Sequence, residues 1–456
     1  MNKFEKTLEF IKQTITRESP FWMHIWLVGG CVRDELLGER YSDLDLLIDL
    51  PQGQKQFVEY MCLTYPDICR GPFYYQRYGT TAMDVVIDDA LTLVECVEPH
   101  VENYADDGVT LLDTRFCSLQ EDAVRRDYTC NALYKNLHSG QVADPTGMGL
   151  EDLNAGLLRT PRDPETIFRQ DPVRMLRGIR FKHQKGFRLD DAAWDAILRC
   201  HNEIATSAPK RVRDELNKLL KTPSFGEAVN DLLICGLLKY VFPGLPDYFD
   251  DNTHLENCQE ETTLWQHTRM ALYTLLKEHP HADSISKLAV LMLDISDKAG
   301  IAQTQELLRG ALIGKEKAGT VLHIIQTYQR YRSFFGMNQT YLGKPRSLPH
   351  FIVGLNGYKA EFRRIVRAMN SGMKPELRVP YNLLYDSSSL PDGKHGNSGR
   401  KKKVSGQGTE TAKPMSNELL EAQKLRNRKR NQKRKEQRRR AKNKRKAARE
   451  AGKTNG

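Results

Sequence analysis

The chain has 456 residues, enough for two or three hydrophobic cores, because a single core stops growing near about 250–300 residues. The hydrophobic fraction of 39% is typical of a globular protein, and no run approaches the roughly 18 apolar residues that would cross a bilayer. Nine cysteines without a C-x-x-C pair indicate neither a disulfide framework nor a zinc knuckle. Residues 1–6 mix charges where a signal peptide turns apolar, so we expect a cytoplasmic protein without a membrane segment.

The net charge of +11 is concentrated at one end of the chain. Residues 424–449 contain sixteen Lys and Arg against one acid, Glu436, which leaves the rest of the chain at about −4. Residues 386–414 are rich in Ser, Gly and Lys and are typical of a flexible linker. We expect a disordered basic tail that either binds RNA phosphates without sequence preference or serves as a solubilising or ribosome-binding appendage.

The first chemical signal is a predicted strand, glycine turn and short helix. Residues 25–28 are β-branched or aromatic, Gly29-Gly30 breaks the run, and residues 31–37 have helical spacing before Gly38. Glycines at such a junction let backbone N–H groups approach a phosphate, and the helix N-terminus favours negative charge. The segment therefore predicts a phosphate-binding turn.

Acidic residues follow on the next predicted strand, residues 43–48. Alternation places Asp43 and Asp45 on the same face, where two carboxylates repel each other unless a cation lies between them. Two-metal phosphoryl transfer uses such a pair to activate a hydroxyl and to neutralise a triphosphate. For the third acid we favour Glu95, at the end of the run 91–94, over Asp84. The alternative interpretation of an isolated Asp-x-Asp is a solvated strand edge.

A polar stripe is predicted on a helix farther along the chain. Asp171, Arg174, Arg177 and Arg180 recur every three residues. Such a stripe is often a salt-bridged surface, yet a carboxylate and a guanidinium are also the groups that hydrogen-bond the edges of cytosine and adenine. In that interpretation Arg177 and Arg180 hold a triphosphate. After Phe181 the pattern is helical throughout, with amphipathic helices at 209–220 and within 225–242.

Several motifs in order resemble one family. Residues 27–45 (LVGGCVRDELLGERYSDLD) look like the signature of the class II tRNA nucleotidyltransferases and bacterial poly(A) polymerases, and the resemblance covers roughly residues 20–245. Residues 125–132 (RRDYTCNA) resemble the family's ribose-selecting motif, residues 144–153 its hinge, and residues 171–181 its amino-acid template. Gln170 and His100 stand where the family usually has an acid and an arginine.

The resemblance implies a set of site residues. It implies catalysis by Asp43, Asp45 and Glu95, with Mg²⁺ held by Asp43 and Asp45. It implies nucleotide binding by the following residues: Gly29, Gly30, Arg33, Arg126, Asp127, Asn131, Asp171, Arg174, Arg177 and Arg180.

Two later segments weakly resemble an HD-type phosphohydrolase domain. They are residues 263–268 (TLWQHT) and 291–297 (LMLDISD). Leu293 stands where such a site needs a second histidine beside Asp294, and loss of that imidazole removes a metal ligand. We therefore expect a helical region without hydrolase activity.

The expected fold is α+β: a nucleotidyltransferase head over 1–135, a neck over 136–245, a helical body over 246–385, and a linker with basic tail over 386–456. The favoured activity is CCA addition to tRNA from CTP and ATP with Mg²⁺. The alternatives are polyadenylation, A-only or CC-only addition, and an inactive RNA-binding protein. Against polyadenylation, residues 78–81 (YGTT) lack the basic signature of bacterial poly(A) polymerases. The sequence does not define the oligomeric state.

Overall fold

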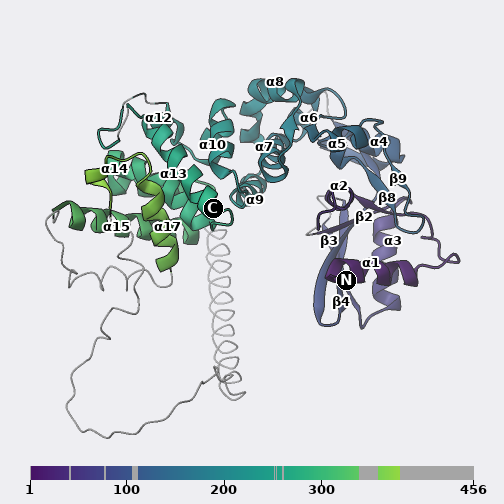
Figure 1. The fold of residues 1–456 in the computed structure, drawn as a ribbon. Helices are drawn as coiled ribbons and strands as arrows, with labels where there is room; N and C mark the ends of the chain where they lie inside the picture. Colours follow the sequence, from purple (N-terminus) through teal and green to yellow (C-terminus); the bar gives the residue numbers. More distant parts are fainter. Residues whose placement is uncertain are drawn as a thin grey trace, which may run out of the picture. The chain divides into compact units, whose positions relative to one another are not determined.

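The computed structural model describes residues 2–40, 43–75, 79–104, 111–250, 252, 254–258, 261–337 and 358–379. All of them belong to one compact unit, Met1–Leu390. The predicted linker and basic tail lie outside the described residues. The α+β class is confirmed, with a sheet-based N-terminal part followed by helices (Figure 1). The boundaries predicted within this unit stay a prediction.

A seven-stranded sheet forms the N-terminal part. Its strands, in spatial order, are β3 (Cys69–Tyr75), β4 (Thr80–Ile87), β5 (Ala90–Val97), β2 (Leu44–Ile48), β1 (Ile25–Val28), β8 (Tyr134–Asn136) and β9 (Val142–Ala143). β2 and β5 are parallel, and the other neighbouring pairs are antiparallel. β5 continues past Glu95, where the sequence pattern predicted its end, because burial still alternates through Val94 and Cys96.

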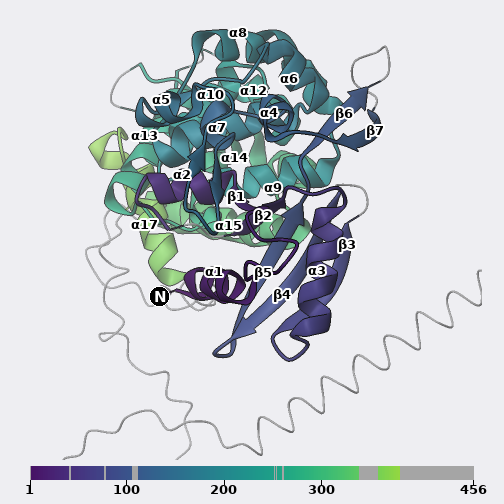
Figure 2. The same cartoon turned by 90° about the vertical axis from the view of Figure 1, so that its right-hand side faces the viewer.

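Helices cover the two faces of this sheet unequally. α1 (Lys3–Thr14) and α3 (Gly53–Thr64) pack on one face (Figure 2). On this face Phe57 and Met61 join Val94 in the main core. A smaller cluster joins Val28 and Leu47 to α4 (Leu119–Val124), which lies over part of the other face. Two further elements are α2 (Gly30–Leu36), after β1, and the hairpin β6 (His100–Tyr104) and β7 (Leu111–Phe116).

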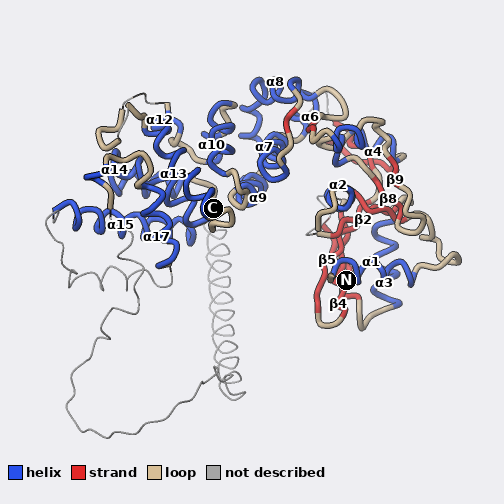
Figure 3. The backbone as a smooth tube through the Cα atoms, in the orientation of Figure 1, coloured by secondary structure: helices blue, strands red, loops and turns tan. Residues whose placement is uncertain are grey.

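The middle of the chain is mainly helical, as predicted. Its elements are η2 (Thr129–Asn131), α5 (Gly149–Asn154), β10 (Leu157–Leu158), α6 (Pro164–Gln170), α7 (Val173–Lys185), β11 (Arg188–Leu189), α8 (Asp191–Cys200), η3 (His201–Thr206), α9 (Pro209–Leu219), α10 (Phe225–Ile234), α11 (Leu238–Val241) and α12 (Pro246–Phe249). The expectation of helix throughout after Phe181 was wrong at β11, which pairs in parallel with β10. Figure 3 shows this short pair apart from the main sheet.

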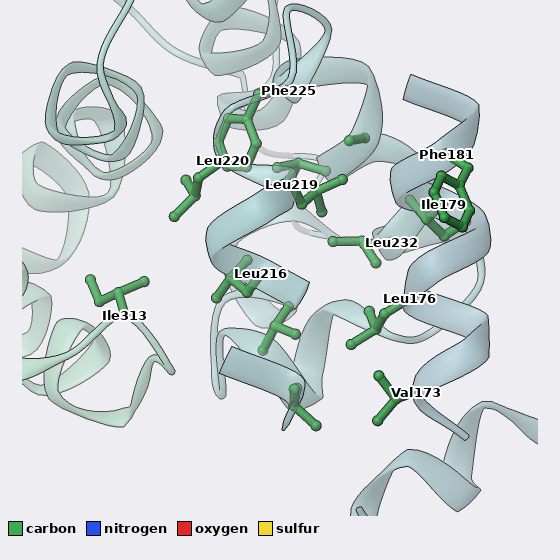
Figure 4. Close-up of a cluster of buried hydrophobic side chains, with 14 of the residues drawn as sticks. Val173, Leu176, Ile179, Phe181, Leu216, Leu219, Leu220, Phe225, Leu232 and Ile313 are labelled. Carbon is green, nitrogen blue, oxygen red and sulfur yellow. The ribbon is translucent and has the colours of Figure 1, made fainter. Parts of the chain in front are cut away.

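Apolar side chains hold α7 in place. Val173, Leu176 and Ile179 are buried on α7 and lie toward Leu216 and Leu219 of α9 (Figure 4). Each fully buried aliphatic side chain contributes about 1.5–3 kcal/mol relative to an exposed one. This packing fixes the helix that carries Arg174, Arg177 and Arg180.

The C-terminal described part consists of α13 (Leu264–Glu278), α14 (Ser284–Gly310, with a non-helical Gly300), α15 (Lys315–Met337), α17 (Lys359–Met369) and η4 (Pro375–Leu377). The fully buried Lys287 of α14 donates from Nζ to the carbonyl oxygens of Leu220 and Thr222, 2.9 and 2.8 Å away. These bonds join α14 to the end of α9. Within the described residues, no helix combines the length and apolarity needed to span a membrane.

Candidate active site

Two acids meet at the centre of the sheet. The parallel register of β2 and β5 sets Asp45 directly opposite Glu95. Both side chains line a cleft of about 830 Å³ together with Arg126 and, from beyond the sheet, Arg174. Asp84 is the alternative to Glu95 as the third acid. It lies on β4 opposite Leu93, two residues before Glu95 on β5, and is outside the described lining of this cleft. The geometry favours Glu95 over Asp84.

The electrostatics of Asp45 indicate negative charge without full compensation. Burial, followed by the charges of Asp43 and Glu95, raises the pKa of Asp45 to about 7. Asp43 lies one residue before β2, close enough for its charge to act on Asp45. Carboxylate oxygens are the donors that hard divalent cations prefer, so this donor set fits such an ion. Among the described residues, however, no three acidic, histidine or cysteine side chains are gathered closely enough to hold a metal.

The glycine turn after β1 lies against the same site. Gly29 has φ +64° and ψ −125°, a conformation that favours glycine, and a Cβ there would lie 3.8 Å from Arg126 Nη1. Cys31 Sγ donates to the Asp43 carbonyl at 3.1 Å and accepts from the Asp45 amide at 3.4 Å. Cys31 therefore ties α2 to the start of β2, a positioning role that the sequence analysis missed.

Arg126 is oriented by a buried acid. Asp122 has no exposed surface and accepts from Arg126 Nη2 at 2.8 Å, from Arg125 Nε at 2.9 Å and from the Tyr134 hydroxyl at 2.7 Å. Burial raises the pKa of Asp122, but Arg126 and Arg125 outweigh this, so the pKa lies well below its usual value. Asp122 was missed from the sequence, although its helical spacing of three and four residues from the two arginines could have revealed it.

A second network lies outside the described lining of the cleft. Asp127 accepts from Arg177 Nε at 2.7 Å, and the Asn131 side-chain amide donates to the same carboxylate at 3.1 Å. Arg33 Nη1 in turn donates to Asn131 Oδ1 at 2.8 Å. These bonds join three parts of the chain: α2, α7 and the segment that follows α4. The three polar motifs that the sequence places far apart are thus part of one connected structure.

Asp171 and Arg174 line the same cleft as the acids. Asp171 precedes α7 rather than belonging to it, so the predicted four-residue stripe is not a single helical face. Arg211 Nη2 of α9 donates to Asp171 Oδ2 at 2.7 Å, whereas Arg174 Nε is 3.7 Å from that oxygen. Asp171 Oδ1 is buried and has no hydrogen-bond partner. Arg211 was missed because it is distant in sequence and its helix position alone indicates only solvent exposure.

Arg177 and Arg180 are engaged by protein carboxylates. Arg177 pairs with Asp127, and Arg180 Nε donates to Glu215 Oε2 at 2.7 Å with its own side chain buried. Neither belongs to the described lining of the cleft. Their predicted grip on a triphosphate stays a prediction, and in this structure they connect α7 to the head and to α9.

Five predicted site residues line the cleft directly: Asp45, Glu95, Arg126, Asp171 and Arg174. The remaining predicted residues lie outside the lining that the structure describes: Gly29, Gly30, Arg33, Asp43, Asp127, Asn131, Arg177 and Arg180. His100 and Gln170, at the two departures from the family pattern, also line the cleft. Burial and then Arg125 lower the pKa of His100, so this position carries less positive charge than an arginine would.

The segments that resemble an HD domain form a separate cavity of about 270 Å³. His267 Nδ1 of α13 lies 2.8 Å from Asp294 Oδ2 of α14, and Thr268 donates to the same oxygen at 2.6 Å. Leu293 is fully buried in the core. The pair thus joins two helices, and the expected lack of hydrolase activity stays a prediction.

Two segments of the chain match known protein-family models. Residues 25–159 match the model described as the poly A polymerase head domain, and residues 186–249 match that described as a probable RNA and SrmB-binding site of polymerase A. Over 227 residues the chain is 32% identical to poly(A) polymerase I of Escherichia coli O6:H1, covering 50% of this chain and 48% of that protein. It is also 32% identical over 246 residues to the mitochondrial CCA tRNA nucleotidyltransferase of Saccharomyces cerevisiae, covering 51% and 45%.

A solved CCA-adding enzyme in its apo form superposes with a TM-score of 0.58 at 19% identity, covering 84% of each chain, which shows a shared fold. The chain therefore shares the fold of this enzyme, with a sheet-based N-terminal part and a helical remainder. More narrowly, residues 25–159 carry a match to the poly A polymerase head domain, and about half of the chain is similar both to poly(A) polymerase I and to a CCA tRNA nucleotidyltransferase. The chain spans about half the length of the curated relatives it matches.

Proposed function

We propose that this protein adds nucleotides to an RNA 3′ end without a nucleic-acid template, with CCA addition to tRNA from CTP and ATP as the favoured reaction. The observation that carries the proposal is the pairing of Asp45 with Glu95 in a cleft that Asp171 and Arg174 also line. Acids that suit a divalent cation and polar groups that can hydrogen-bond a base are the groups that a nucleoside triphosphate site needs.

The acids of the sheet would hold a divalent cation, Mg²⁺ in our proposal. Asp45 and Glu95 would bind it, with Asp43 as the further ligand that the sequence predicts. A bound cation of this kind supplies positive charge that makes the RNA 3′ hydroxyl more acidic and offsets the charge of the triphosphate. Arg126, which Asp122 holds in place, directs a fixed cation toward the same space.

Asp171 and Arg174 would select the base. Asp171 Oδ1 is a buried acceptor without a partner, and such an atom costs about 1–3 kcal/mol until a donor meets it. The exocyclic amino groups of cytosine and adenine are donors of this kind, whereas uracil presents a carbonyl at the equivalent position. This supports a preference for CTP and ATP over UTP.

Polyadenylation is the second candidate. The similarity to Escherichia coli poly(A) polymerase I supports it, at the same 32% identity as to the yeast tRNA enzyme. In our proposal both activities would use the same acids and the same base-selecting side chains. The distinction therefore lies in which RNA is accepted and when addition stops.

The deciding experiment offers CTP, ATP, UTP and GTP, singly and together, to tRNA ending before, within and after CCA, and to an unrelated RNA. CCA addition predicts that C is added twice, A once, and that growth stops there. Unlimited A addition to either RNA would identify polyadenylation, while A-only or CC-only addition would give partial products. No incorporation with any nucleotide in the presence of Mg²⁺ would favour the inactive RNA-binding protein.

The cytoplasmic location expected from the sequence remains a prediction.

A further inference from the structure

The register of the sheet assigns side chains to its two faces. Antiparallel partners share a face, so Phe73 lies on the same face as Ala82, and Ala82 on the same face as Glu95. Tyr74, between Phe73 and Tyr75, points the other way, because its hydroxyl donates to Glu59 of α3 at 2.5 Å. Phe73 and Tyr75 therefore belong to the face that carries the acids.

That face is only partly covered. The small cluster with α4 packs over β1, β2 and β8. Over β3 and β5, in contrast, four large apolar side chains remain exposed: Phe73 at 38%, Tyr75 at 44%, Leu91 at 48% and Leu93 at 38%. Phe73 and Tyr75 lie at neighbouring positions on this face of β3, and we name these two residues the open patch. Leu91 and Leu93 lie on β5, on the other side of β4. Two adjacent exposed rings indicate a binding surface, whereas single apolar residues need no explanation.

The open patch is continuous with the candidate active site. Asp45, Glu95, Ala82 and Phe73 occupy one row across β2, β5, β4 and β3. Neighbouring strands lie about 4.8 Å apart, so Phe73 is about 10 Å from Glu95 along this row. Stacked nucleotides advance by about 3.4 Å each, which places Phe73 about three nucleotides from a 3′ end held at the acids.

The chemistry of the patch suits bases rather than phosphates. Asp45 and Glu95, at the end of the row that contains Phe73, repel phosphate groups. In the adjacent row the positive charge of Arg70 lies opposite the negative charge of Asp84, so this row has no net charge that would attract phosphates. Exposed aromatic rings bind any base through its flat face. We propose that the open patch, with Phe73 and Tyr75 as its stacking residues, binds the last unpaired nucleotides before the 3′ end of the acceptor RNA. This inference rests on the proposed function, which requires a 3′ hydroxyl at Asp45.

The test compares Phe73→Ala with Tyr74→Ala in the full-length protein. Tyr74 is an exposed aromatic residue on the same strand that faces the opposite side, so it controls for damage to β3. Phe73→Ala should raise the KM for an RNA with at least four unpaired nucleotides at its 3′ end about 5- to 150-fold, because one stacked base contributes about 1–3 kcal/mol. The KM for CTP should not change, and Phe73→Trp, which keeps an aromatic face, should restore binding. Equal effects of Phe73→Ala and Tyr74→Ala would overturn the proposal.

Abasic RNA locates the contact. Single abasic sites are placed at each of the four nucleotides before the 3′ end. At one of these positions, close to the third, the abasic site and Phe73→Ala together should cost less binding free energy than the sum of their separate costs. The reason is that both changes remove the same stacking pair. Additive losses at all four positions would contradict the inference.

A binding measurement separates this inference from the proposed function. Fluorescence anisotropy of a labelled RNA with a single-stranded 3′ end should show weaker binding by Phe73→Ala than by Tyr74→Ala, whether or not nucleotides are incorporated. If the unaltered protein incorporates nothing, the proposed function fails while this measurement still decides the inference. A changed sedimentation behaviour of Phe73→Ala with unchanged RNA binding would instead identify a contact between copies of the chain and overturn the inference.

Discussion

Asp122 is a fully buried carboxylate shared by Arg125, Arg126 and Tyr134. Removing one partner of such a group leaves the opposite charges buried without compensation. Asp122→Ala should lower the free energy of unfolding by about 3–5 kcal/mol, measured by urea denaturation. Glu121→Gln, at an exposed acid of the same helix, should change it by less than about 1 kcal/mol. Similar losses in both variants would show that Asp122 does not organise the arginines.

Asp45 and Asp84 offer a matched pair for testing the acid assignment. Both are aspartates on the sheet, but only Asp45 lies in the cleft beside Glu95. Asp45→Asn should reduce nucleotide incorporation by at least about 10²- to 10³-fold while RNA binding remains, because the charge that would hold the cation is lost. Asp84→Asn should retain near-normal activity. Activity in Asp45→Asn comparable to that of Asp84→Asn would refute the acid assignment.

The sequence indicated the chemistry of single residues better than their partners. The positions of Asp45, Glu95 and Asp171 in one cleft could be predicted because strand alternation and motif order are local properties of the chain, and their roles stay predictions. Cys31 and Arg211 could not, since their roles depend on contacts between segments that only the folded chain brings together. The partner of Arg180 could not be predicted either, because its burial against Glu215 depends on the packing of α7 with α9.

Between elements, the contact of α7 with the head depends on one missing side chain. A Cβ on Gly178 would lie 2.2 Å from the Tyr128 hydroxyl, which is buried and donates to the Arg174 carbonyl at 3.0 Å. Gly178→Ala should destabilise the protein by about 1–3 kcal/mol through overpacking, even though alanine favours helix. Gly319→Ala, in α15 with open space around the new methyl group, should be neutral or slightly stabilising in the same denaturation measurement. Equal stability changes would contradict the close fit.

The pair of His267 and Asp294 links α13 to α14 and should make this link depend on pH. Burial lowers the pKa of His267, but the Asp294 carboxylate outweighs this, so the pKa lies above its usual 6.5. The stabilisation is therefore complete below about pH 6.5 and is lost as pH rises through the elevated pKa. The difference in unfolding free energy between the unaltered protein and His267→Gln should shrink from pH 6 to pH 9. A constant difference would mean that the charge on His267 contributes nothing.

Element boundaries were predictable where turn residues mark them, as at Gly29 and Gly38 around α2. β5 extended further than the pattern suggested, because its pairing with both β2 and β4 stabilises residues beyond the apolar run. β11 was missed because a two-residue strand has too little periodicity to be seen.

At the scale of the complete chain, the charge of residues 424–449 is the main feature that lies outside the described residues. Deleting residues 415–456 should weaken RNA affinity and flatten its dependence on salt, because each phosphate contact on a single strand contributes about 0.7 to the log–log slope. Filter binding from 50 to 300 mM salt measures this. An unchanged slope would assign the tail a role other than binding RNA.

The parallel pairing of β2 with β5 has a consequence for how the protein is made. Asp45 and Glu95 are separated in sequence by the whole of α3, β3 and β4, and closing such a connection is among the slower steps of folding. In a growing polypeptide Asp45 lacks its neighbour Glu95 until β5 has left the ribosome and paired with β2. Affinity for the proposed cation should thus arise only after Glu95 has emerged from the ribosome.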